Sequence, residues 1–152
     1  MGPQVRGNDE LGERRMGKPF KGVILLSLLA IMRPDSASAN ACYDLKGGIV
    51  VAEDGTYLGK IADHYDPDSI FNKLGVHGSR FSDESIWNIF GEYGGKFGQH
   101  SPFNLFGTPP LILRNQVPVA YLSSNKALQG AVDPVLIAIV CYGLEDYAQL
   151  RP

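Results

Sequence analysis

The feature that most constrains the fold is a pattern that repeats every 16 residues in the middle of the chain. A segment of the form Ser-x-aromatic-Asn-x-apolar-Gly occurs at residues 69–75, 85–91 and 101–107. The spacers align as well, because His-Gly-Ser-Arg-Phe at 77–81 matches Tyr-Gly-Gly-Lys-Phe at 93–97. One such unit is too small to bury its own apolar groups, so the pattern predicts units that stack on one another.

Each copy is expected to form about one helical turn that is capped at both ends. The serine is typical of an N-cap, whose hydroxyl accepts from backbone amides two or three residues on. The closing glycine is typical of a left-handed helix terminator. The asparagines favour side-chain bonds to the backbone that stabilise a turn. The third and sixth positions of the three copies are then expected to stack side by side: Phe71, Trp87 and Phe103, with Leu74, Phe90 and Phe106.

Two strings extend the pattern, Tyr-Asp-Pro-Asp-Ser-Ile at residues 65–70 and Asp-Gly-Thr-Tyr-Leu-Gly at residues 54–59. With the Asn-x-aromatic-Gly closures and the Gly-Ser-basic-aromatic spacers, they resemble a family of small exported bacterial proteins with tandem Asp-Ser-Ile-x-Asn-Pro-Tyr-Gly repeats. This chain lacks the proline after each asparagine and has leucine or phenylalanine where that family usually has tyrosine. The resemblance implies export and a repeat fold, and it implies no activity.

The first 41 residues predict a signal peptide. An apolar run at 22–32 is preceded by basic residues and followed by small-x-small sites that end at Ala39 and Ala41. Eleven apolar residues are too few for a membrane-spanning helix, which needs about 20. We therefore expect cleavage after Ala39 or Ala41 and export to the periplasm or the medium, with Met16 as an alternative start. The basic residues are Arg14, Arg15, Lys18 and Lys21.

The remaining 111 residues predict one small acidic domain. They keep 8 of the 14 Lys and Arg and 12 of the 16 Asp and Glu, a net charge of −4, without a basic run that would indicate nucleic-acid binding. Cys42 and Cys141 stand near the two ends of this part, and in an oxidising compartment one disulfide is the simplest interpretation. The domain is expected over 42–143, with a flexible tail at 144–152.

Two β-hairpins are expected on either side of the repeats. The β-prone runs 49–52 and 56–61 flank an Asp-Gly pair, which is a strong hairpin signal. A second, weaker hairpin is expected from 111–114 and 119–122, with its turn near Asn115-Gln116. Pro118 cannot donate to a ladder, so we place it at an edge or in the connection.

Asp133 and Pro134 predict the start of a short helix that runs through Val140 and stops before Gly143. The same apolar run also fits a buried strand. The predicted fold class is thus a small α+β or irregular repeat domain: a hairpin, three capped single-turn repeats, a second hairpin and a C-terminal helix.

A metal site is the first chemical alternative, because His64 stands among Asp63, Asp66 and Asp68. The calcium-loop pattern is absent, since no third acid is in register and no glycine marks the sharp turn. Asp68 also has a structural explanation, because it precedes the capping Ser69 and a negative charge favours the start of a helical turn. We expect a domain without a cofactor, and a divalent metal bound by these four residues is the alternative.

Nucleophilic catalysis finds little support in the sequence, and we lean against an enzyme. The repeat serines are assigned as caps, and no serine stands in a Gly-x-Ser-x-Gly elbow. A thiol enzyme requires Cys42 or Cys141 to be unbonded.

The aromatic residues suggest a binding function. Ten of the 15 lie between Tyr57 and Phe106, and we expect most of them to stack in the interior. If some form an exposed row, they make a platform for sugar rings or a partner protein. We therefore predict an exported binding or structural module whose partner is an envelope protein or a glycan. The alternative is a metal-binding exported protein. The platform candidates are Phe71, Trp87, Tyr93, Phe97 and Phe103.

Overall fold

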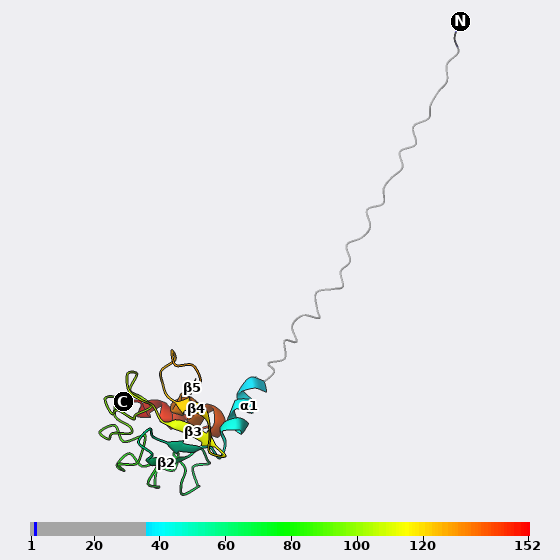
Figure 1. The fold of residues 1–152 in the computed structure, drawn as a ribbon. Coiled ribbons are helices and arrows are strands. Elements are labelled where there is room, and N and C mark those ends of the chain that lie inside the picture. The colour runs from blue at the N-terminus through cyan, green and yellow to red at the C-terminus, as the bar shows by residue number, and fades with distance from the viewer. Residues whose placement is uncertain (1, 3–35) are drawn as a thin grey trace. The chain divides into compact units, whose positions relative to one another are not determined.

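The computed structural model describes Gly2 and residues 36–152 (Figure 1). Residues 36–152 form a small α+β domain with a five-stranded mixed sheet and a few short helices. The basic and apolar parts of the expected signal peptide lie outside the described residues. Both expected cleavage positions, after Ala39 and Ala41, lie within helix α1 (Ser36–Leu45). In the described part of the chain, no helix is long and apolar enough to cross a membrane.

The first predicted hairpin is confirmed. Strands β1 (Ile49–Val51) and β2 (Tyr57–Lys60) pair antiparallel around the Asp-Gly turn. Gly55 has φ +89°, a left-handed conformation that glycine adopts without steric cost. The Asp54 carboxylate accepts a hydrogen bond of 2.9 Å from the Thr56 amide, which fixes the turn locally.

The second predicted hairpin is also confirmed, with β3 (Leu111–Arg114) paired antiparallel to β4 (Val117–Leu122). Its two turn residues, Asn115 and Gln116, have φ of +49° and +66°, as a two-residue primed turn requires. Pro118 lies where the register shifts opposite Leu113. A bulge of this kind tolerates proline, because the ladder is already interrupted there.

The sheet has the order β2-β1-β3-β4-β5. The short strand β5 (Ala131–Val132) runs parallel to β4 and pairs only with the last two residues of β4. In the sheet that the described residues form, the part of β4 around Pro118 therefore has β3 as its only neighbouring strand. The repeat-bearing residues form the long connection from β2 to β3. Figure 1 shows them as green loops beside the sheet.

The C-terminal part begins with the predicted helix. Asp133 caps α2 (Pro134–Leu136) by accepting from the Val135 amide at 2.8 Å. The helix continues as the π-helix η1 (Ile137–Cys141), and Gly143 follows with φ +67°. The residues beyond it, expected as a flexible tail, include the 3₁₀-helix η2 (Glu145–Leu150), which buries Tyr147 completely.

The predicted disulfide is present. Cys42 of α1 and Cys141 of η1 are bonded, with their α-carbons 5.4 Å apart and 99 positions apart in sequence. The end of α1 is also held by Arg114, whose guanidinium donates to the carbonyl oxygens of Tyr43 and Asp44. Cationic donors at the last carbonyls of a helix stabilise it. The bond is compatible with an exported protein.

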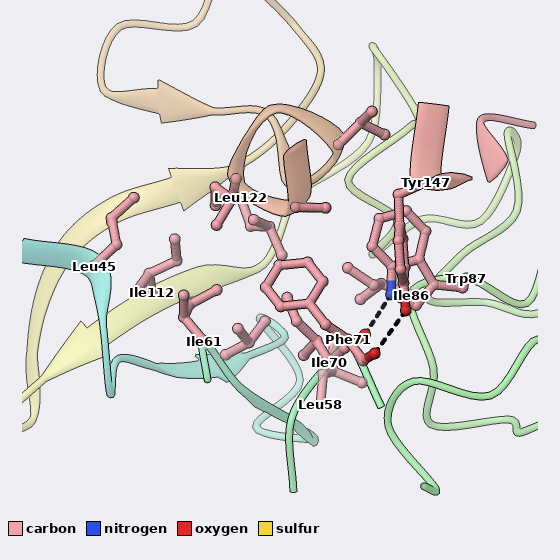
Figure 2. Close-up of a cluster of buried hydrophobic side chains, with 14 of the residues drawn as sticks. Leu45, Leu58, Ile61, Ile70, Phe71, Ile86, Trp87, Ile112, Leu122 and Tyr147 are labelled. Atoms are coloured by element: carbon pink, nitrogen blue, oxygen red, sulfur yellow. Dashed lines mark hydrogen bonds between the residues drawn. The ribbon is translucent and has the colours of Figure 1, made fainter. Parts of the chain in front are cut away.

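One continuous core joins the sheet to the repeat-bearing connection (Figure 2). Its sheet side includes Val50, Leu58, Ile112 and Leu122. Its other side is formed by Tyr147 from η2 and by five apolar residues of the connection. These five are Ile70, Phe71, Ile86, Trp87 and Phe103.

Candidate functional site: an exposed apolar edge

Residues 64–107, which we call the turn segment, consist of successive hydrogen-bonded turns. In the second copy the Asn88 amide donates to the Ser85 carbonyl and the Gly91 amide donates to the Asn88 carbonyl. Equivalent bonds occur in the first and third copies. Within each copy, these backbone bonds begin at every third residue, whereas in a helix they begin at every residue. The prediction of single helical turns is therefore wrong, and each copy consists of two consecutive turns.

The side chains at the recurring serine and asparagine positions explain why turns form here instead of helix. Each serine hydroxyl accepts from the amide two residues on, at 3.0–3.1 Å. Each asparagine oxygen does the same at 3.0–3.2 Å, and its nitrogen donates to the carbonyl six residues earlier. Such local bonds compete with the helical ladder for backbone groups. The residues are Ser69, Ser85 and Ser101 with Asn72, Asn88 and Asn104.

The closing glycines have a different role from the one expected. Gly75, Gly91 and Gly107 do not have positive φ, so the prediction of a left-handed terminator is wrong. Close approach of the chain explains Gly75 and Gly107 instead. A Cβ would lie 2.8 Å from the Pro67 carbonyl oxygen at Gly75 and 2.4 Å from the Gln99 carbonyl oxygen at Gly107. At Gly91 the nearest contact would be 3.2 Å, to the side chain of Asn88.

The aromatic residues at the third position lie in the core. The Trp87 ring has Phe71 and Phe103 as neighbours, with ring centroids 6.3 and 5.8 Å away. Its indole N–H donates to the Ile70 carbonyl at 2.5 Å (Figure 2). Tyr147 packs edge-on against Trp87 and donates to the Phe71 carbonyl at 2.8 Å. Burial raises the pKa of Tyr147 to about 12.

The apolar residues at the sixth position point the other way. Each is the third residue of a turn that opens at the asparagine and closes at the glycine, which places it at an outer corner. The expectation that they pack beside the aromatic stack is therefore wrong. A second series with the same period of 16 is exposed too, so six large apolar residues are 83–98% exposed. We call this set the exposed edge: Tyr65, Leu74, Phe81, Phe90, Phe97 and Phe106.

Three surface hollows connect members of the exposed edge. The first, of about 410 Å³, lies between Tyr65 and Leu74. The second, of about 330 Å³, lies between Phe81 and Phe90. The third, of about 340 Å³, lies between Phe90 and Phe97. Phe90 borders both the second and the third hollow, which links Phe81, Phe90 and Phe97 along the surface.

Each hollow includes a cationic side chain. Lys73 borders the first, where it pairs with Asp146 and lies 5.2 Å from the centroid of the Tyr147 ring. Arg80 borders the second and Lys96 the third, and both are exposed. Among the described residues, neither forms an ion pair with a carboxylate. Glu92, which also borders the third hollow, accepts from the Gln99 amide.

Three acids of the turn segment lie near basic side chains, and two of these acids lie beside Lys60 of the β1–β2 hairpin. Asp66 pairs with Lys60 of β2 at 2.9 Å, and the hydrogen bond from that ammonium lowers the pKa of Asp66. Asp68 lies 4.0 Å from the same nitrogen. Glu84 lies 4.0 Å from the buried His77.

The residues considered for a metal are not arranged around a common point. Asp66 and Asp68 turn to Lys60, and Asp63 accepts from the Tyr65 amide. His64 lies 3.6 Å from Asp63. Nowhere in the described part of the chain do three or more His, Cys, Asp or Glu side chains form a group that could hold a metal ion.

Of the five aromatic residues considered for a platform, the structure exposes only Phe97 fully; Phe71, Trp87 and Phe103 are buried. Tyr93 is half-buried and links the turn segment to the first hairpin. Its hydroxyl donates to Asp54 at 2.8 Å and lies 2.9 Å from the Thr56 hydroxyl. The Thr56 amide is the main cause that lowers the pKa of Asp54, and Tyr93 adds to it. Tyr93 therefore has a structural role.

The exposure of the sixth-position residues, which was not predicted, does have a signal in the sequence. Leu74, Phe90 and Phe106 each stand two residues after an asparagine that opens a turn, and that position is an outer corner. No protein-family profile, curated protein or solved structure matches this chain. The candidate site is thus defined by its geometry, an apolar edge interleaved with cations.

Proposed function

We propose that the chain is an exported binding module and that the exposed edge is its contact surface. The observation that carries the proposal is the exposure of six large apolar side chains, 83–98% each, at a regular spacing. Soluble proteins rarely keep contiguous apolar patches exposed without an interaction that uses them. These side chains contribute little to the core, so packing within the domain does not account for them.

The proposal includes a repeat architecture, in which the three copies at 69–75, 85–91 and 101–107 are equivalent stacked units. The recurring serine and asparagine bonds support it. So do the ring contacts that link Phe71 to Trp87 and Trp87 to Phe103. Stacked units present equivalent groups in a row, which suits a partner that is itself extended or repetitive.

Export is supported by the N-terminal pattern of the sequence and by the disulfide. Disulfides persist mainly in oxidising compartments, which include the periplasm and the medium. The proposed partner is therefore a component of the cell envelope. The metal-binding alternative is not proposed, because the carboxylates beside His64 are occupied by Lys60 and by turn amides.

The test compares three forms of the oxidised protein for retention on envelope fractions: membranes, cell-wall polysaccharide and soluble envelope proteins. The edge variant carries Phe81→Ser, Phe90→Ser and Phe97→Ser. The control variant carries Val117→Ser, Val119→Ser and Leu136→Ser, which are exposed apolar residues elsewhere. We expect wild type and control to be retained on one fraction and the edge variant to be lost from it. Equal retention of all three forms would refute the proposal.

A further inference from the structure

We propose that the exposed edge docks the domain on a lipid bilayer whose head groups are anionic. This inference rests on the proposed binding function and names the partner. Three features of the exposed edge favour a bilayer over other partners: how far its side chains protrude, how few polar atoms they carry, and where the neighbouring charges lie.

The side chains of the exposed edge protrude rather than form a flat face. Phe81 and Phe90 are each 93% exposed, so they make almost no contact with their own domain. A protruding phenylalanine enters the boundary between head groups and acyl chains without any matching pocket. Protein interfaces instead need shape complementarity around their apolar anchors.

The six side chains of the exposed edge carry one polar atom in total, the hydroxyl of Tyr65. Specific recognition of a small polar ligand such as a sugar needs a few precisely placed hydrogen-bonding groups besides apolar surface. Insertion into the hydrocarbon of a bilayer requires no such groups, because the free energy gained by an apolar side chain depends on the area that is removed from water. Phenylalanine and leucine are typical residues of the apolar face of interfacial segments.

The charges beside the exposed edge complement anionic head groups. Arg80 and Lys96 directly precede Phe81 and Phe97 and border the same hollows, so a lipid phosphate reaches the cation when the ring inserts. Asp66 pairs with Lys60 at 2.9 Å, while Asp68 and Glu84 lie 4.0 Å from Lys60 and His77. Two exposed acids oppose this attraction in part: Asp83, two residues after Phe81, and Glu92, which borders the same hollow as Lys96.

Vesicle co-sedimentation tests the inference, with phosphatidylcholine vesicles and with vesicles that also contain phosphatidylglycerol. The oxidised wild type is expected to bind the anionic vesicles more tightly than the neutral ones. Each single Phe→Ser change at residues 81, 90 and 97 is expected to weaken binding about tenfold, since it removes one inserted ring. Arg80→Glu with Lys96→Glu is expected to abolish the preference for anionic vesicles. The control variant with serines at 117, 119 and 136 is expected to bind like wild type.

The outcomes separate this inference from the proposed function. In one outcome the wild type binds neither kind of vesicle, while the edge variant still loses retention on polysaccharide or envelope protein. This result overturns bilayer docking and leaves the proposed binding function in place. Vesicle binding that depends on Arg80 and Lys96 but not on the phenylalanines also overturns insertion. If the edge variant matches wild type on every fraction and every vesicle, both proposals are wrong. Melting temperatures of the variants, which alter only exposed side chains, show whether each is folded.

Discussion

Replacing both Cys42 and Cys141 by serine removes the covalent link between α1 and η1. The bond joins residues that are 99 positions apart. For a loop of about 100 residues, the chain-entropy estimate of its stabilisation is about 4.7 kcal/mol at 25 °C. Small secreted domains typically lose about 2–5 kcal/mol with a native disulfide. We expect a loss of about 4 kcal/mol, a large part of the roughly 5–15 kcal/mol that a domain has in total.

Trp87 provides the assay, because it is the only tryptophan and is fully buried. Its fluorescence reports the loss of the core around it. At about 4–8 °C for each kcal/mol, the melting temperature should fall by roughly 15–30 °C in the double variant. The denaturant m-value should rise, since the unfolded chain without the bond exposes more surface.

Chemical reduction of the wild type is the matched control, because it breaks the same bond without any substitution. It should reproduce the shift of the double variant. A double variant and a reduced wild type that both melt within a few degrees of the oxidised protein would refute the role assigned to the bond.

Three further predictions concern the core and the turns. Trp87→Phe should cost about 3 kcal/mol in denaturant titrations followed by circular dichroism, because the ring shrinks and the Ile70 carbonyl loses its partner. Gly94→Ala should cost about 1–3 kcal/mol, since its Cβ would lie 2.5 Å from a carbonyl oxygen, whereas Gly91→Ala should cost clearly less, with 3.2 Å available. Tyr147 should ionise only near pH 12 in an absorbance titration, so its contribution to stability is complete below about pH 10 and is lost as the pH rises from there to about 12.

Each of these has a result that would contradict it. A Trp87→Phe variant as stable as wild type would show that the indole bond is unimportant. Equal costs at Gly94 and Gly91 would contradict the close approach at Gly94. Ionisation of every tyrosine near pH 10 in folded protein would contradict the burial of Tyr147.

The elements with strong local signals were predictable from the sequence. The Asp-Gly pair at 54–55 sets the first hairpin, and Asp133 before Pro134 starts the C-terminal helix. The disulfide followed from having two cysteines only, near the ends of the expected mature chain. These predictions succeeded because each depends on a few adjacent residues or on a simple count.

The direction of the repeat side chains was not predictable in the same way. Phe103 and Phe106 are the same residue type three positions apart, yet one is buried and the other is exposed. The difference arises from the turn that opens at Asn104, and periodicity alone does not show it. Tyr147 was missed because its ring is buried against Phe71 and Trp87, and Phe71 lies 76 residues earlier in the chain.

A single labelled position tests the role of the exposed edge most directly. The two native cysteines are bonded to each other, so Phe90→Cys introduces one free thiol for a polarity-sensitive fluorophore. Val119→Cys on β4, also exposed, is the control position. On addition of isolated envelope membranes, the label at residue 90 should shift to the blue and brighten, while the label at 119 should not change. No shift at residue 90, or equal shifts at both positions, would contradict membrane docking through the exposed edge.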